Sequence, residues 1–532
     1  MGKVVFNRFD GGIADDYVRC SPGECSISKN FDLLSYPFRL QPIRGMVSAN
    51  EPSGTALRMM IHAHNGNMYG IGEDPGNPGN WELYKRTGYG GSDGWTDFTT
   101  DQLSGSANSE GAGHFDFLVH YPEANNARKL IWASTNKIIF SNPDDSGSAD
   151  SGFLPFTTIG QGLVHPKDKM LYFPYQTSTA TIIGKYNGPA GAGYDGGGNL
   201  SNFTDAAFTV ATPSRYRIYC LSHYGDLLAV PMTVAGVSAE SVVGLWNRDT
   251  TVTTFDQTIP WGAGLLKVLN NLNGALIGVS VLSGEISTSG LDIDKIQVKV
   301  YEGGAEPYVV KEITATRLTS TRPSCTINHR VNFIHNNRLY FSANVVNGDS
   351  DANYYGLWSV GKNKLGQWTV IREQGATNDD SETGVIAAAK HGDFLSCVHS
   401  SAGTITSSYA DDTLASIYEA TSSYETGPNQ GIPEDDRHKR KKLKCFFATY
   451  LPLPSGGQVT LKYRVNSKKS DSWSTALVES TAGATLTEEV VDSDSSQFPE
   501  FDINEIRAES IEGAIITSFG YEYDLVDTQQ SE

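Results

Sequence analysis

The residue groups in this sequence that could carry chemistry are paired histidines, acidic clusters and one basic run. His62 and His64 alternate along one predicted strand, so both imidazoles lie on the same side, where a third ligand could complete a metal site. Comparable hairpins carry His223, His335 and His391, and this recurrence favours a structural role at turns. We therefore predict no metal site.

The carboxylates give no catalytic pattern. Hard oxygen ligands could bind calcium, but the acidic clusters lack the Asp-x-Asp-x-Asp-Gly spacing; they lie at 144–145, 349–351, 379–380 and 411–412. Ser92-Asp93-Gly94-Trp95 has the residue types of a sialidase Asp-box at a different spacing. There is no phosphate-binding loop before a helix and no Gly-x-Ser-x-Gly elbow. The prediction is no catalytic residue, no cofactor and no enzyme activity.

The basic run stands out because the chain carries a formal net charge of -19. It follows the acidic segment 434–436 and comprises Arg437, Lys439, Arg440, Lys441, Lys442 and Lys444. Lysines on an exposed edge strand protect it from pairing with other chains, whereas a basic patch can also dock on an acidic surface of a neighbouring subunit. Both interpretations stay open, and the specific prediction is a subunit interface.

The elements that must position these residues are short strands. Of the 532 residues, 39% are hydrophobic and 10% aromatic, and 55 are glycine. Apolar runs recur between turns such as Asn65-Gly66 and Asn273-Gly274, which favour two-residue hairpins. The hairpins are spaced roughly 50 to 65 residues apart, close to the ~40 to 50 of propeller blades. The pattern predicts an all-β fold, an irregular β-propeller of about seven blades; the alternative is two or three stacked β-sandwiches.

Composition shifts suggest the domain boundaries. Residues 1–50 have little periodicity and are predicted to form an N-terminal arm, followed by the propeller at 51–425. Residues 426–436 are rich in turn formers and are predicted to be a linker. The alternating strands of residues 437–532 predict a C-terminal β-sandwich.

The cysteines and the N-terminus indicate a protein that folds in a cytoplasm. Only Cys20 and Cys25 are close in sequence, and free thiols are favoured over a disulfide there. The first residues contain no signal-peptide core, and no apolar run approaches the ~18 residues of a membrane helix. We expect no membrane anchor.

Two segments near the N-terminus resemble a family of tailed-bacteriophage virion proteins. They are Phe9-Asp10-Gly11-Gly12-Ile13 and the stretch 30–44, Asn-Phe-Asp-Leu-Leu-Ser-Tyr-Pro-Phe-Arg-Leu-Gln-Pro-Ile-Arg. Two segments nearer the C-terminus, Pro454 to Val459 and Lys462-Tyr463-Arg464, are similar to the family's C-terminal sandwich. The resemblance implies a structural tail component of propeller type, similar to the nozzle proteins of short-tailed phages.

The resemblance sets the functional expectation. It implies a non-enzymatic homo-oligomeric ring in the virion tail, contacting portal, adaptor or other tail proteins and guiding or retaining DNA until ejection, without sequence-specific binding. Such a closed ring forms through heterologous contacts around an axis. The alternatives are a peripheral host-receptor or glycan-binding propeller and, ranked lower, a glycosidase.

Overall fold

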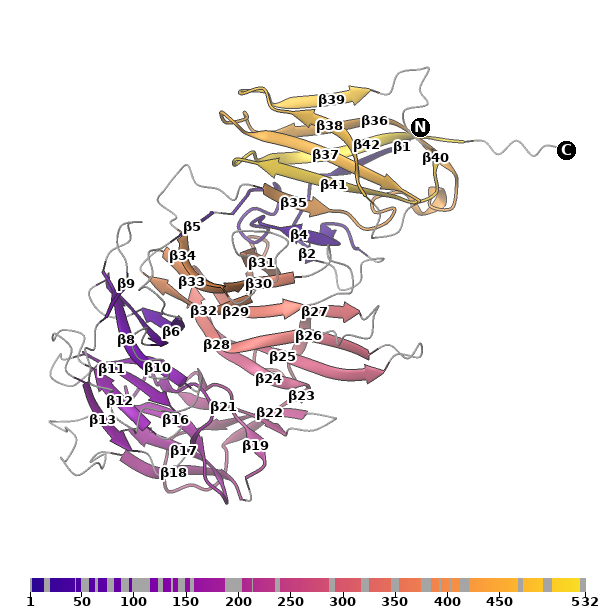
Figure 1. The fold of residues 1–532 in the computed structure, drawn as a ribbon. Helices are drawn as coiled ribbons and strands as arrows, with labels where there is room; N and C mark the ends of the chain where they lie inside the picture. The colour runs from indigo at the N-terminus through magenta and orange to yellow at the C-terminus, as the bar shows by residue number, and fades with distance from the viewer. Residues whose placement is uncertain are drawn as a thin grey trace.

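The computed structural model shows an all-β chain in two units, a ring of sheets and a sandwich (Figure 1). No helix in the described residues is long and apolar enough to cross a bilayer. The described residues are 2–13, 20–43, 45–48, 57–62, 66–73, 81–87, 95–97, 115–122, 128–134, 137–141, 149–153, 157–186, 203–212, 214–234, 240–286, 292–316, 325–345, 354–374, 384–391, 394–401, 404–410, 421–466, 472–490 and 500–526.

The ring contains seven antiparallel sheets in the described part of the chain, which confirms the predicted irregular propeller. The first three blades are β6–β9 (Leu57–His62, Met68–Glu73, Trp81–Arg86, Trp95–Asp97), β10–β13 (Phe115–Pro122, Arg128–Ser134, Lys137–Ser141, Ala149–Phe153) and β14–β18 (Thr157–Thr158, Leu163–Val164, Leu171–Gln176, Thr181–Tyr186, Phe203–Ala211). The next two are β19–β23 (Tyr216–Arg217, Ser222–Tyr224, Leu227–Val234, Glu240–Trp246, Gln257–Ala263) and β24–β27 (Leu265–Leu272, Ala275–Ile286, Asp292–Tyr301, Tyr308–Thr316). The last two are β28–β31 (Cys325–His335, Arg338–Val345, Tyr354–Lys362, Trp368–Gln374) and β32–β34 (Gly384–His391, Phe394–Ser401, Thr404–Ala410).

The first strand of each blade is the innermost. β6 lies beside both β10 and β32, and β28 lies beside both β24 and β32, so neighbouring first strands surround a common axis. Each blade then runs outward as a meander. The last blade receives its outer strand from far away in the sequence, because β5 (Met46–Ser48) pairs with β34. This pairing closes the ring with an N-terminal strand.

The C-terminal unit is a sandwich of two sheets. One has the order β1-β42-β36-β39, with β40 beside β36; the other has the order β38-β37-β41-β35-β4. The strands are β1 (Gly2–Phe6), β4 (Ile27–Lys29), β35 (Thr421–Glu425), β36 (Lys441–Tyr450), β37 (Gln458–Val465), β38 (Ser474–Glu479), β39 (Leu486–Val490), β40 (Glu500–Phe501), β41 (Asn504–Ile511) and β42 (Ile516–Leu525). β35 lies inside the range 51–425 that was assigned to the propeller, yet it pairs with β41. The segment that follows it contains the 3-10 helix η3 (Glu434–Asp436).

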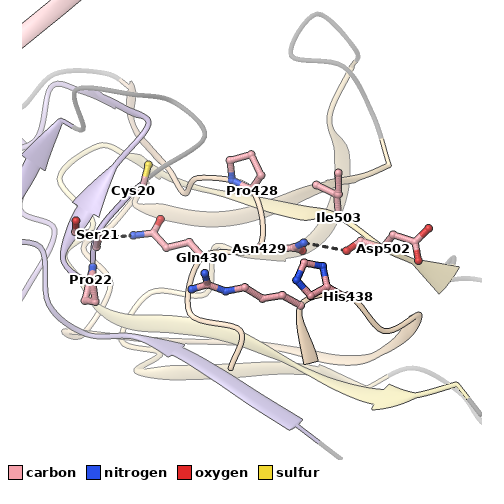
Figure 2. A pocket seen from close by; sticks show the side chains of 10 residues that line it. Cys20, Ser21, Pro22, Pro428, Asn429, Gln430, His438, Asp502 and Ile503 are labelled. Carbon is pink, nitrogen blue, oxygen red and sulfur yellow. Dashed lines mark hydrogen bonds between the residues drawn. The ribbon is translucent and has the colours of Figure 1, made fainter. Parts of the chain in front are cut away.

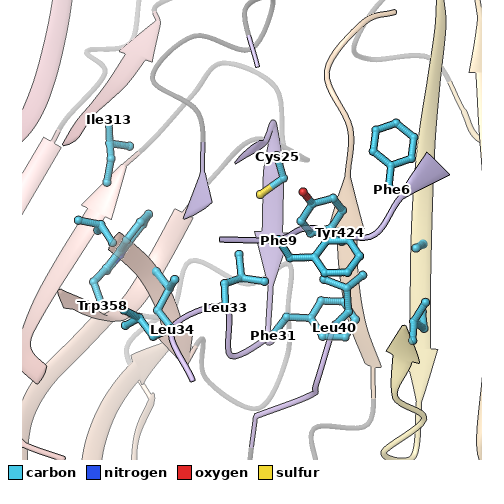
Figure 3. Packing of buried hydrophobic residues seen from close by; sticks show 14 of the residues in the cluster. Phe6, Phe9, Cys25, Phe31, Leu33, Leu34, Leu40, Ile313, Trp358 and Tyr424 are labelled. Carbon is cyan, nitrogen blue, oxygen red and sulfur yellow. The ribbon is translucent and has the colours of Figure 1, made fainter. Parts of the chain in front are cut away.

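The N-terminal arm contributes strands to both units and fills the space between them. It gives β1 and β4 to the sandwich and β5 to the ring, and its β2 (Gly12–Ile13) pairs in parallel with β3 (Glu24–Cys25). Figure 3 shows Phe9, Leu33 and Leu34 of the arm between Trp358 of the ring and Tyr424 of the sandwich. Phe9 is fully buried, with its ring edge-on to Tyr424 at 5.2 Å between centroids. One continuous hydrophobic core therefore joins ring, arm and sandwich.

An ion-pair network fixes the same arm to the ring. Both Oδ atoms of Asp32 accept hydrogen bonds from Arg338 at 2.9 Å. The guanidinium also contacts Glu373 at 2.5 Å, and the two carboxylate side chains are mostly buried. If this buried cation is removed, its two carboxylates remain buried without a counter-charge.

Candidate functional site

Every innermost strand of the ring has an irregular register near one level of the axis. The pairing skips Arg58 in β6, Asp116 in β10, Lys267 in β24 and Ile386 in β32, and it skips the segment 329–331 in β28. In the remaining two blades the inner strand is interrupted, between β14 and β15 and between β19 and β20. Bulges re-aim side chains and are over-represented next to active sites. We call this level the bulge belt, defined as residues 58, 116, 159–162, 218–221, 267, 329–331 and 386.

An aromatic and cationic group lies on one side of the bulge belt. The rings of Tyr219 and His329 are 5.5 Å apart between centroids, and the Lys267 ammonium is 5.4 Å from the centroid of the Tyr219 ring. All three side chains are partly exposed, whereas the residues that flank Lys267, Leu266 and Val268, are buried. The bulges therefore present polar side chains from strands whose other residues form the core.

The positive charges of Lys267, Arg217 and Arg330 lie close together at this group and repel one another. Burial lowers the pKa of Lys267, and the nearby positive charge of Arg217 lowers it further. Burial, together with the charges of Arg330 and Lys267, lowers the pKa of His329 to about 3. His329 is consequently neutral near pH 7, so its imidazole has one acceptor nitrogen.

Backbone and amide hydrogen bonds fix the belt. Asn328 donates to the Ile386 carbonyl at 2.6 Å, and Asn332 donates to the Leu269 carbonyl at 3.3 Å. Asn270 in turn donates to Asn332 at 3.1 Å. These bonds join adjacent blades, so the belt is held rigidly before any ligand arrives.

Glycine allows the closest approach within the belt. A Cβ atom on Gly160 would lie 2.2 Å from the carbonyl oxygen of Ile218. The next residue, Gln161, donates its backbone N–H to Tyr219 at 2.9 Å. The third blade thus positions the Tyr219 segment of the fourth through backbone contact.

A second polar group is buried in the seam between the third and fourth blades. Asp168 accepts hydrogen bonds from Tyr172 at 2.8 Å and from Arg248 at 2.6 Å. Burial would raise the pKa of Asp168, but these bonds and the Arg248 charge outweigh it, so the pKa is lowered. His165 lies beside them, fully buried, and burial with the Arg248 charge lowers its pKa to about 4. The Arg248–Asp168 ion pair and the Tyr172 hydrogen bond hold this group together, while His165 Nε2 and Arg248 Nε have no hydrogen-bond partner among the described residues.

The buried histidines predict a loss of stability in mild acid. His165 and His399 have a pKa of about 4 in the folded chain, below the 6.5 of an exposed histidine, mainly because both are buried. The unfolded chain therefore binds more protons between pH 6.5 and 4, and stability falls as the pH is lowered through this window. Each histidine contributes at most about 3 kcal/mol. Urea unfolding at pH 7.5, 6 and 5 measures the effect, and an unchanged midpoint across these values contradicts it.

The six residues of the predicted interface mostly contact their own chain. Lys439 pairs with Asp436, Arg440 with Glu500 and Lys444 with Asp524, at 2.9 to 3.0 Å. Arg437 donates to the Ile432 carbonyl at 3.2 Å, and Lys442 is exposed. Lys441 is fully buried, and its ammonium donates to the carbonyls of Arg437, Lys439 and Asp502. The subunit interface stays a prediction, but the Lys441 ammonium is enclosed by its own chain.

A groove of about 770 Å³ lies beside this segment, between the arm and the sandwich (Figure 2). Cys20, Ser21 and Pro22 line one side, and the other is lined by residues including Arg437, His438, Asp502 and Ile503. Gln430 crosses its floor and donates to the backbone of Ser21 at 3.0 Å and of Glu24 at 2.8 Å. The residues that line the groove include no paired catalytic groups.

Replacing Lys441 with Met should destabilise the sandwich by about 2 kcal/mol, because three carbonyls lose their donor. Lys442→Met is the matched control, since that neighbouring side chain is exposed, and it should change stability by less than about 0.5 kcal/mol. Urea unfolding midpoints compare the two. Equal midpoints would show that the buried ammonium is dispensable.

Several sequence candidates lie outside the described residues. These are His64, the turn at 92–94 and the acidic clusters at 144–145, 349–351, 379–380 and 411–412. Among the residues that are described, no three His, Cys, Asp or Glu side chains gather in a metal-binding arrangement. The bulge belt was missed from sequence, although one signal was visible: Lys267 interrupts the apolar run Leu265-Leu266 and Val268-Leu269.

Comparison with known proteins gives structural neighbours alone, since no protein-family model and no curated protein matches the chain. One neighbour is a GH43 glycoside hydrolase engineered for xylanase and arabinofuranosidase activity, with a TM-score of 0.27 and 10% identity over 91% of this chain and 100% of that one. Another is an α-L-arabinofuranosidase of Fusarium graminearum, with a TM-score of 0.32 and 12% identity over 69% and 97%. A third is the propeller domain of the Trilobed protease of Pyrococcus furiosus, with a TM-score of 0.31 and 11% identity over 58% and 89%.

These neighbours correct the expectation drawn from the N-terminal segments. Glycoside hydrolases recur among the structures compared with this chain, and none of those compared is a virion or tail protein. The predicted phage-tail resemblance, the nozzle-like ring for DNA ejection and the absence of enzyme activity are therefore contradicted. The physical reason is that Phe9, Phe31, Leu33, Leu34 and Leu40 of the quoted segments lie in the hydrophobic core and carry no function-specific chemistry.

Proposed function

We propose that this protein is a glycan-binding propeller whose ligand site is the bulge belt. The observation that carries the proposal is the group of Tyr219, His329 and Lys267 on the inner strands, with the amides Asn270 and Asn332 beside it. Binding sites combine aromatic faces with a few fixed polar groups. Sugar rings match this combination because they present both apolar C–H faces and many hydroxyl groups.

The position on the axis supports a ligand site. The belt residues come from all seven blades of the ring, and bonds such as Asn332 to Leu269 cross from one blade to the next. A ligand here contacts several rigid elements at once, so little ordering is needed on binding. The groove of Figure 2 is lined by Arg437 and His438 but by no tyrosine, phenylalanine or tryptophan.

The test is a glycan array followed by calorimetry on the full chain. Tyr219→Ala should weaken binding of the selected glycan about tenfold, the equivalent of about 1.4 kcal/mol. Tyr308→Ala is the control, because Tyr308 is an exposed tyrosine on an outer strand. Absence of binding to any glycan, or equal loss in both variants, would overturn the proposal. Fluorogenic glycosides assayed alongside show whether bound glycans are also cleaved.

A further inference from the structure

We infer that the bulge belt binds the acid group of an anionic sugar, an inference that rests on the glycan-binding function proposed above. The starting observation is the state of the cations. In the described residues, Lys267 and Arg217 have no ion pair, and the one contact of the Lys267 ammonium is the Tyr219 ring at 5.4 Å. A carboxylate or a sulfate ester placed between them would supply the missing counter-charge.

Five other enclosed cations of the protein have partners within their own chain. Arg248 pairs with Asp168, Arg338 with Asp32 and Arg464 with Glu505. Lys299 and Lys441 instead donate to backbone carbonyls. Burying a charge without such a partner is costly. Lys267, in contrast, has no carboxylate or carbonyl partner among the described residues, and it lies at a bulge on the axis.

The two cations differ in a way that suits one anionic group. An ammonium acts as a point charge, whereas a guanidinium can donate two parallel hydrogen bonds to a carboxylate or sulfate. Arg217 lies two residues before Tyr219, whose ring contacts the Lys267 ammonium, so both cations lie close to that ring. Tyr219 and neutral His329 then provide the surface for the sugar ring.

The net charge of the chain makes this local group selective. A formal charge of -19 disfavours the approach of anions to the surface in general. An acidic sugar that binds must therefore gain its affinity from direct contacts with Lys267 and Arg217. Neutral sugars would use the aromatic faces alone.

The experiment compares three probes of matched length on the full chain by calorimetry: an oligogalacturonate, its carboxyl-reduced neutral counterpart, and a sulfated galactan oligomer. We expect at least one anionic probe to bind tenfold or more tightly than the neutral one. Binding of the uronate alone assigns the site to carboxylates, and binding of both anions assigns it to either acid group. Equal binding of neutral and anionic probes overturns this inference and leaves glycan binding intact. Absence of binding by all three, together with a blank glycan array, removes both.

Variants locate the site. Lys267→Met should weaken the anionic probe about tenfold and leave the neutral probe unchanged, which a merely structural role would not produce. Lys185→Met is the matched control, since that ammonium lies 5.8 Å from the Tyr172 ring and belongs to β17, the third strand of its blade and away from the axis. If Lys267→Met binds the anionic probe as the parent does, with an unchanged melting temperature, the inference is wrong.

Discussion

Replacing Arg338 with Met should lower the free energy of unfolding by about 3–5 kcal/mol, because Asp32 and Glu373 would remain enclosed without their cation. Arg338 is the link between the arm and the sixth blade, with both Asp32 oxygens at 2.9 Å. The loss should appear as a lower urea midpoint and as faster proteolysis of the arm.

The control is Lys362→Met on the same blade. Lys362 pairs with Glu302 at 2.9 Å, but both side chains are close to half exposed. Exposed pairs contribute about 0–1 kcal/mol. If the two variants unfold at the same urea concentration, the network at Arg338 has no special role in holding the arm.

Phe9→Ala should be comparably destabilising, by about 3–5 kcal/mol, because a fully buried aromatic ring is removed from the junction of the two units. Phe9 contacts Tyr424 edge-on and stacks with Phe519 at 6.2 Å, so the cavity would open between arm and sandwich. Calorimetric melting is the measurement.

The matched control for this change lies on the same arm. Phe38 is 56% exposed, and Phe38→Ala should therefore leave the melting temperature nearly unchanged. A similar fall for both substitutions would indicate a general effect of altering the arm. A fall confined to Phe9→Ala locates the effect in the shared core.

The hairpins of the ring were predictable because their turns are encoded locally. Asn273 and Gly274 have φ angles of 53° and 88°, and Asn336 and Asn337 have 47° and 56°. These are the left-handed values that Asn and Gly adopt most easily, and they make the two-residue turns legible in the sequence. Repetition of such turns led to the correct fold class.

The long-range pairings and the bulges were not predictable. Nothing in Met46-Val47-Ser48 specifies that these residues pair with Ser408 to Ala410, since the partner is set by the geometry of the closed ring. A bulge likewise depends on how two strands meet, and a single lysine among apolar residues is a weak signal of it. The functional expectation failed for a related reason: it relied on arm residues whose role is packing.

Closure of the ring by β5, with pairing of β1 to β42, has a consequence for how the chain folds during synthesis. The ribosome makes β1 and β5 long before the strands they pair with, since β34 ends at Ala410 and β42 at Leu525. Such pairing raises the contact order and slows folding, and the waiting edges are open to misassembly. Blades in the middle of the chain can form as they emerge, while completion of both units is a single late step shared by the two ends.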